Sequence, residues 1–450
     1  MRYWQSGAAH TILVLLCLLL AGELLARLIP SLRRLGLPLA LLSGAAALGL
    51  GEQGLGLFRL DVGLLEAVVY HGLALVFIAV GLKAPAAGAT TTGARSMAFA
   101  IVAMMSTQAL IGLGILLLLE PQAHPGLGLL LPLGFEEGPG QALAMGTTWE
   151  ATGLHDGAQI GLIMAVFGYG WCILGGVPLV MIGRRRGWAL PAGHFTEGRL
   201  SLRSEAPPDE VGGLDALSLQ AGVVGACYLM TWALCSALAH LLTPFPDLAS
   251  MVWGFHFIFG AGVAMVARPL LARTPGGNPV DDRLMGRLGG LTVDVITCAA
   301  LAAVQVGVLQ SRWLPILVIT TAGGLWTLLL SVWIARRAWT DAPFEHAVLW
   351  FGMSTGTLPT GLALLRVVDP DLRSPAAVSA VFGSAASVLG LMPLLMVLMP
   401  ATVAAWGPDW PASGWRMWGL LAAFTAAVFI MWRAVGGLRL RRPWSAAWPP

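Results

Sequence analysis

Long apolar segments of similar length dominate the sequence. A helix needs about 20 predominantly apolar residues to cross the hydrocarbon core of a bilayer. The segments that meet this requirement are 9–28, 37–56, 64–82, 96–119, 157–182, 217–242, 247–271, 290–309, 313–338, 376–402 and 414–432. In lipid, backbone N–H and C=O groups must be hydrogen-bonded within a helix or within a closed β-barrel. The alternation of apolar and polar residues that is typical of barrel strands is absent. The sequence therefore predicts eleven membrane-spanning helices.

Composition indicates the same class of protein and excludes others. The residues Ala, Val, Ile, Leu, Met, Phe, Trp, Tyr and Cys make up 57% of the chain and only 11% of residues are charged, whereas soluble proteins carry roughly 25% charged residues. So few charges cannot cover the surface of a soluble globule of this size. The formal net charge of +3 is too small to indicate nucleic acid as a partner. We therefore expect an integral membrane protein whose surroundings are the lipid bilayer.

No motif in the chain points to covalent catalysis or a resident cofactor. The five cysteines lie inside apolar segments without Cys-x-x-Cys spacing and are interpreted as small core residues; they are Cys17, Cys172, Cys227, Cys235 and Cys298. The sequence lacks His-Glu-x-x-His, a Gly-x-Ser-x-Gly elbow on a strand and a paired Gly-x-Gly-Asp motif. We expect no enzyme activity, no cofactor and no metal beyond a transported cation.

Two further apolar stretches, 126–150 and 343–366, are interrupted in the middle by glycine, proline and polar residues. The first contains Glu136-Glu137-Gly138-Pro139-Gly140, which a straight membrane-spanning helix does not tolerate at its centre. Each stretch either crosses as a broken helix or enters the membrane and returns on the same side. The positions of Lys and Arg distinguish these alternatives because cytoplasmic loops collect basic residues.

The re-entrant alternative gives the better division of charge. If both stretches return on the side from which they enter, cytoplasmic segments hold 22 basic residues and outside segments hold 4. If both stretches cross, the division is 12 against 14. The sequence thus predicts an N-terminus outside and a C-terminus in the cytoplasm. The first stretch then enters from the outside and the second from the cytoplasm.

The order of segments is the same in the two halves of the chain. Residues 1–182 contain four spans, a re-entrant stretch and a fifth span, and residues 217–402 repeat this order. Because five is an odd number, the halves face opposite sides of the membrane. Residues 183–216 form a cytoplasmic linker, and residues 403–450 add one span and a basic tail. Inverted repeats with broken helices are typical of secondary transporters, although two similar hydropathy profiles can also arise by chance.

The tips of the two re-entrant stretches offer groups that bind small anions. Half-helices that begin inside the membrane present free N–H groups and a positive partial charge, and unwound carbonyl groups suit a cation. Glycine permits close approach, proline breaks the helix, and hydroxyl groups donate and accept. We expect substrate to be bound by Gly138, Pro139, Gly140, Gln141, Ser354, Thr355, Gly356, Thr357, Pro359 and Thr360. For any single Gly or Thr, packing between helices is an equally good explanation.

Ionisable residues inside apolar segments are candidates for function because they are costly there. Glu136 and Glu137 are adjacent at the first tip and could hold a cation or share a proton. Asp294, at the position that corresponds to Glu66 in the first half, is a third candidate cation ligand, although side chains near an interface also reach water by snorkelling. Weaker candidates, which more often bond between helices, are Glu23, Tyr70, His71, Gln108, Gln159, His256 and Gln305.

Two motifs carry a resemblance to a known family. Phe135-Glu136-Glu137-Gly138-Pro139-Gly140-Gln141-Ala142 is followed by Trp149, and the second motif is Gly352-Met353-Ser354-Thr355-Gly356-Thr357-Leu358-Pro359-Thr360-Gly361. In these motifs, and in the order of spans over 35–402, the chain resembles the bacterial sodium/glutamate symporter family. That family carries Ser-Gly-Gly-His-Gly-Thr-Gly-Ala-Ala before Trp in its first half and a glycine-rich run leading to Ala-Thr-Pro-Thr-Ala in its second. Here Glu136-Glu137 replaces Gly-His.

The resemblance implies an all-helical membrane protein of two inverted five-span repeats, here with one additional span. It also implies a homodimer in the bacterial inner membrane that couples Na⁺ to uptake of L-glutamate or a related carboxylate by alternating access. The Glu136-Glu137 replacement favours an alternative, an H⁺-coupled carrier of another small organic solute. A channel with two re-entrant loops as its filter is a further alternative.

Overall fold

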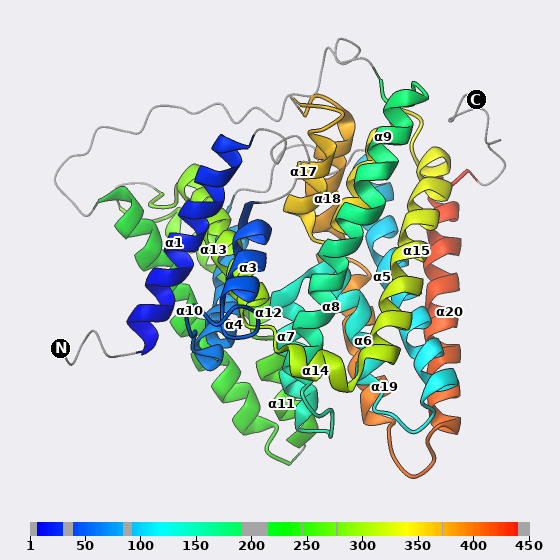
Figure 1. Ribbon diagram of the computed structural model, residues 1–450, viewed down its shortest axis with the longest axis horizontal. Coiled ribbons are helices and arrows are strands. Elements are labelled where there is room, and N and C mark those ends of the chain that lie inside the picture. The colour runs from blue at the N-terminus through cyan, green and yellow to red at the C-terminus, as the bar shows by residue number, and fades with distance from the viewer. Residues whose placement is uncertain are drawn as a thin grey trace.

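The fold is helical throughout the part of the chain that the computed structural model describes (Figure 1). That part comprises residues 7–29, 39–83, 92–190, 215–244, 246–275, 278–370 and 372–439. The only β-type pairing within it is an isolated bridge between Gly51 and Phe58. The described chain is therefore an all-helical, polytopic membrane protein, as the apolar segments predict.

Eight helical segments are long and apolar enough to cross a bilayer within the described residues. They are α1 (Gly7–Leu28), α4 (Val62–Leu82), α5 (Thr92–Leu119), the continuous run of α8 (Gly157–Trp171), η2 (Cys172–Gly176) and α9 (Val177–Arg185), α10 (Ala216–Leu241), α13 (Asp282–Ala302), α15 (Trp313–Ala338) and α20 (Ala412–Ala434). All eight overlap predicted spans, although α13 begins eight residues before the predicted segment 290–309.

Three other predicted spans are not single long helices. Segment 37–56 contains only the short helix α3 (Leu39–Leu50). Segment 247–271 is divided into α11 (Pro246–Gly254) and α12 (His256–Leu271), and 376–402 into α18 (Pro375–Leu389) and α19 (Met392–Ala404). The last two helices are bent by 56° and count as at most one further span.

Local packing and backbone preferences explain these interruptions. At the α11–α12 junction, a Cβ on Gly254 would lie 2.6 Å from Thr148 Oγ1, so the chain approaches a neighbouring helix more closely than a side chain permits. The bend between α18 and α19 falls at Gly390, just before a proline in the first turn of α19. Segment 290–309 also ends early, with α13 stopping at Ala302 and a short helix, α14 (Val306–Ser311), following.

The helices form two groups that lie side by side (Figure 1). In the first group α4 packs against α12 and α13, α13 packs against α3, α1 packs against α3, and α10 packs against α12. In the second group α5 packs against α15, α18 and α20. The additional C-terminal span α20 is fixed on α5, where the indole N–H of Trp418 donates to the Leu110 carbonyl at 2.9 Å.

The two interrupted stretches of the sequence lie among these long helices. Residues 126–150 fold into α6 (Gly126–Pro132), the π-helical turn η1 (Leu133–Glu137) and α7 (Pro139–Glu150). Residues 343–366 fold into α16 (Pro343–Met353) and α17 (Leu358–Leu365). Both stretches are therefore helical on either side of a break, at the positions where the sequence places the interruptions.

Candidate functional site

The first broken stretch begins and ends at the same end of the molecule. Gly126, at the start of α6, packs against the side chains of Trp149 and Leu154, which follow at the end of α7. His124 joins the two ends, because its Nδ1 accepts from the Gly126 N–H at 3.1 Å and its Nε2 lies 3.2 Å from Thr152 Oγ1. Burial lowers the pKa of His124 to about 4, so the imidazole is neutral and can accept at Nδ1.

The second broken stretch is also a hairpin whose two ends lie together. His346 Nε2, near the start of α16, is 3.2 Å from Ser379 Oγ in the first turns of α18. The end of α17 is held nearby, because the Asp369 N–H donates to the Leu365 carbonyl at 2.8 Å and the Asp369 carboxylate accepts from the Ser374 N–H at 2.7 Å. Within the hairpin, a Cβ on Gly361 would lie 2.6 Å from the Leu349 carbonyl oxygen.

The two hairpins start at opposite ends of α5. The first follows the C-terminal end of α5, whereas the second lies beside its N-terminal end, where the indole N–H of Trp339 donates to the Gly93 carbonyl at 3.3 Å. Gly93 also packs against Ser379. Because α5 has 28 residues and a helix rises about 1.5 Å per residue, its ends are about 42 Å apart, more than the thickness of the hydrocarbon core.

The breaks of the two hairpins touch each other. A Cβ on Gly138 would lie 2.6 Å from Thr357 Cγ2 and 3.7 Å from the Gly356 carbonyl oxygen, and a Cβ on Gly168 of α8 would lie 2.6 Å from the Thr355 carbonyl oxygen. The Ser354 hydroxyl donates to Glu136 Oε1 at 3.2 Å. Residues predicted to bind substrate from the two halves of the chain are thus brought together at one place.

Corresponding positions in the two breaks have similar backbone conformations. Gly138, at the N-cap of α7, has φ 85° and ψ −175°, and Thr357, at the N-cap of α17, has φ 146° and ψ 169°. A proline, Pro139 or Pro359, follows in the first turn of each helix. No side-chain hydrogen bond caps the N-terminus of α7 or of α17. Two uncapped helix N-termini therefore face the contact between the breaks, and such N-termini attract anions.

A buried polar cluster extends the contact into α5 and α15. The Gln108 amide nitrogen donates to Thr327 Oγ1 at 2.9 Å and to the Ser354 carbonyl at 3.0 Å. Glu137 Oε2 accepts from the Gln141 amide at 2.5 Å, and Thr357 and Thr360 hydroxyl oxygens are 3.4 Å apart. Glu136, Gln108 and Ser354 are buried, whereas Glu137 is half-buried.

Some site residues were not predicted, and one predicted residue lies elsewhere. The Tyr169 hydroxyl is close to the side chains of Thr297 and Thr357, so α8 contributes to the same cluster. Only its glycine-flanked position in an apolar span could have indicated this role. Asp294 is exposed on α13, and no hydrogen bond or ion pair joins it to either break in the described parts of the chain. Glu66 instead accepts from the Gln159 amide at 2.6 Å.

Residues Gly352-Met353-Ser354-Thr355-Gly356 spell Gly-x-Ser-x-Gly, the pattern of a nucleophile elbow in hydrolases. That elbow joins a strand to a helix, whereas Ser354 lies at the C-terminal end of α16 and precedes another helix. Its hydroxyl donates to Glu136. We therefore assign Ser354 to the polar cluster.

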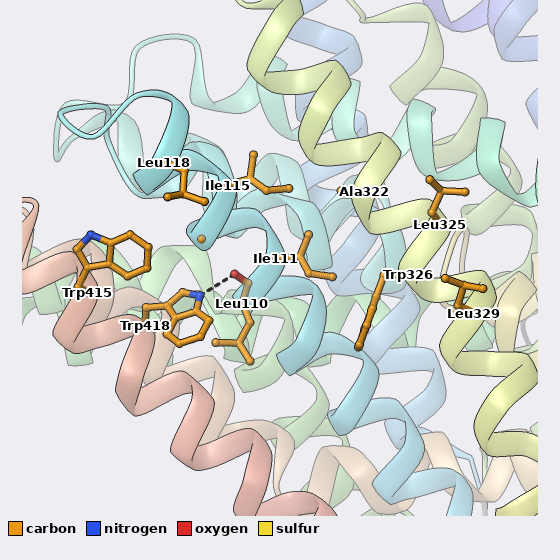
Figure 2. A pocket seen from close by; sticks show the side chains of 11 residues that line it. Leu110, Ile111, Ile115, Leu118, Ala322, Leu325, Trp326, Leu329, Trp415 and Trp418 are labelled. Atoms are coloured by element: carbon orange, nitrogen blue, oxygen red, sulfur yellow. Dashed lines mark hydrogen bonds between the residues drawn. The ribbon is translucent and has the colours of Figure 1, made fainter.

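A separate groove of about 500 Å³ lies on the surface formed by α5, α15 and α20 (Figure 2). Its lining is apolar and includes Leu118, Leu329 and Trp326. The indole N–H of Trp418 donates to the Leu110 carbonyl, as Figure 2 shows. Such a surface offers nothing to an anion. The polar contact between the two breaks remains the candidate site for a charged solute.

Comparison with models of protein families, with curated proteins and with solved structures finds no match for this chain.

Proposed function

We propose that the protein is a cation-coupled secondary transporter that moves a small anionic solute by alternating access. The observation that carries this proposal is the contact between two broken hairpins that start at opposite ends of α5. A site at this contact can be reached from either side of the membrane in turn. L-Glutamate or a related carboxylate with Na⁺ is the pair that the family resemblance implies, in a homodimer of the bacterial inner membrane.

Helix packing supports the inverted-repeat arrangement on which alternating access depends. In an inverted repeat of 1–182 and 217–402, counterpart helices pack in matching ways. Accordingly α4 packs against its counterpart α13, and α5 against its counterpart α15. The contact of α3 with α13 is matched by that of α12 with α4, and the contact of α1 with α3 by that of α10 with α12. The span α20 lies outside this scheme.

The chemistry of the contact suits a carboxylate. The uncapped N-termini of α7 and α17 supply unpaired N–H groups and positive partial charge. Gln141, Thr357 and Thr360 add side-chain donors at the same N-termini. We therefore place the substrate carboxylate at Gly138–Gln141 and Thr357–Thr360, with Glu136 or Glu137 serving the coupling cation.

Uptake into proteoliposomes tests the proposed function. Purified protein reconstituted into vesicles should accumulate labelled L-glutamate, or another acidic amino acid or dicarboxylate, when an inward Na⁺ or H⁺ gradient is imposed. The flux should saturate with solute concentration, whereas single-channel currents would indicate a pore. Absence of both gradient-driven uptake and solute counterflow for all these acids would overturn the proposal.

The adjacent carboxyl groups favour H⁺ coupling as a second candidate. Glu137 is half-buried and lies next to Glu136 in the chain, so its negative charge favours a cation or proton bound there by about 1.4 kcal/mol. Glu137→Gln should therefore raise the cation concentration needed for half-maximal uptake roughly tenfold, since 1.4 kcal/mol corresponds to a factor of ten. Unchanged cation and pH dependence in Glu137→Gln would assign this side chain a structural role.

Hydrogen bonds made by Gln159, in the first turn of α8, hold this end of the molecule closed. Gln159 of α8 donates to Glu66 of α4 at 2.6 Å and accepts from the Gln305 N–H, before α14, at 2.9 Å. The distribution of basic residues places this end outside. Gln159→Leu should therefore shift the population toward an outward-open state by about 1–3 kcal/mol, and a cysteine at Thr360 should react faster with an impermeant maleimide added outside. An unchanged rate would show that Gln159 does not hold this end closed.

A further inference from the structure

Two oxygen atoms in the buried cluster lack a donor. Glu136 is 7% exposed and Gln108 is fully buried. Glu136 Oε1 accepts from Ser354, but within the described residues Glu136 Oε2 has no partner, and Gln108 Oε1 has none either. Both side chains bond to Ser354, Glu136 through the hydroxyl and Gln108 through the backbone carbonyl. Ser354 therefore bonds to two side chains, each of which has an acceptor oxygen without a donor.

The orientation of the Gln108 amide is fixed by its neighbours. One N–H donates to the Ser354 carbonyl, which only accepts. The other donates to Thr327 Oγ1, whose own hydrogen is used by the Gly323 carbonyl at 2.7 Å. Turning the amide would place its oxygen against two atoms that have no hydrogen to offer. Gln108 Oε1 is thus an acceptor directed at a place where the described side chains supply no hydrogen.

One bound proton meets the needs of this cluster better than a metal cation. Hard metal cations such as Ca²⁺ take six to eight oxygen ligands, whereas two buried side-chain oxygens of this cluster lack a partner among the described residues, so a metal cation would need most of its ligands from backbone carbonyls. A proton on Glu136 removes a buried negative charge and turns its unpartnered oxygen into a neutral hydroxyl. The neighbouring Glu137 is different, because it is half-buried and accepts from the Gln141 amide, an arrangement that suits the ionised form. The surroundings of the two carboxyl groups therefore favour the protonated form of Glu136 and the ionised form of Glu137.

We propose that Glu136 carries the coupling proton of this transporter, with Gln108 positioning Ser354, whose hydroxyl donates to Glu136. This inference rests on the proposed function and specifies its coupling ion. The elements that pack against η1 are α6, α7 and α8, and Ser354 at the end of α16 contacts Glu136 directly. Beside the break these elements carry the titratable groups Glu137, on η1 itself, and Tyr169, on α8. Glu136 takes up the proton when the site is open to one side and releases it to the other.

Replacement by the neutral isostere separates proton coupling from solute binding. In Glu136→Gln the new amide oxygen can still accept from the Ser354 hydroxyl, so the site should stay intact. We expect vesicles with this variant to lose accumulation of labelled L-glutamate driven by an inward H⁺ gradient without Na⁺, and to retain counterflow of the same solute. The matched control is Glu120→Gln, a partly exposed residue paired with Arg312 at 3.3 Å, which should accumulate glutamate as the unmodified protein does.

The outcomes distinguish this inference from the function on which it rests. Accumulation by Glu136→Gln under the H⁺ gradient would overturn the inference and leave the transporter proposal in place. The inference would also be overturned if accumulation by the unmodified protein required Na⁺ and did not respond to the H⁺ gradient. If the unmodified protein shows neither accumulation nor counterflow of glutamate, aspartate or dicarboxylates, the proposed function itself fails.

Infrared spectroscopy tests the protonation of Glu136 without any solute. The C=O stretch of a protonated carboxylic acid is absent from a carboxylate, so purified protein in a detergent without ester groups should show this band at neutral pH. The band should disappear in Glu136→Gln and persist in Glu137→Gln. A spectrum in which Glu136→Gln leaves the band intact, or Glu137→Gln removes it, would overturn the assignment even if transport is proton-coupled.

Discussion

Gly138→Val should abolish solute accumulation and lower the stability of the folded protein. Gly138 has φ 85° and ψ −175°, a region essentially restricted to glycine, and other residues there cost about 1–3 kcal/mol. The valine Cβ would also lie 2.6 Å from Thr357 Cγ2 and push the two breaks apart. Because displacements near 1 Å can reduce activity about 100-fold, we expect uptake to fall by a similar factor.

Gly170→Val is the matched control for this variant. Gly170 lies within α8, and a Cβ at this position would meet no atom within 4 Å. Initial uptake rates in vesicles with equal amounts of reconstituted protein compare the two variants directly. Uptake by Gly138→Val at the level of Gly170→Val would mean that contact between the breaks is not needed for transport.

Gly112→Leu should cause the largest loss of stability because it separates α6 from α5. A Cβ on Gly112 would lie 2.0 Å from the Gly128 carbonyl oxygen, and a Cβ on Gly128 would lie 2.4 Å from the Gly112 carbonyl oxygen. Backbones this close require small residues, and overpacking costs about 1–3 kcal/mol or more. The thermal unfolding midpoint in detergent, measured by size-exclusion chromatography after heating, should decrease markedly relative to the unmodified protein.

Gly222→Leu serves as the control, since Gly222 is exposed on α10 and a Cβ there would have no neighbour within 4 Å. Its midpoint should be unchanged. Equal midpoints for Gly112→Leu and Gly222→Leu would show that the first hairpin does not depend on close packing against α5.

The sequence was sufficient to locate the breaks because their cause is local. Gly138-Pro139 and Thr357-Leu358-Pro359 interrupt apolar stretches with residues that cannot continue a helix, and the structure breaks at these residues. The long spans were predictable for the same reason, since length and hydropathy act within one segment. The division at Gly254 was not, because a close contact with Thr148 of α7 accompanies it.

The composition of the polar cluster could not be derived from the sequence. Gln108 and Ser354 are 246 positions apart, and Glu136 and Ser354 are 218 apart. A single glutamine in an apolar span indicates a hydrogen bond between helices without indicating its partner. The predicted correspondence of Asp294 with Glu66 does not hold, because Glu66 lies in the first turns of α4 (Val62–Leu82) whereas Asp294 lies in the middle of α13 (Asp282–Ala302). Glu66 bonds to Gln159 and Asp294 is exposed.

Cysteine accessibility at the ends of the two hairpins tests the central claim most directly. Single cysteines would be introduced at the exposed positions Gln122 and His155, which flank the first hairpin, and Asp341 and Arg366, which flank the second. The five native cysteines would first be replaced. With an impermeant maleimide, we predict that Gln122→Cys and His155→Cys react only from outside the cell, and that Asp341→Cys and Arg366→Cys react only from the cytoplasmic side. If the two ends of either hairpin react from opposite sides, that segment crosses the membrane, and the proposed mechanism of transport is wrong.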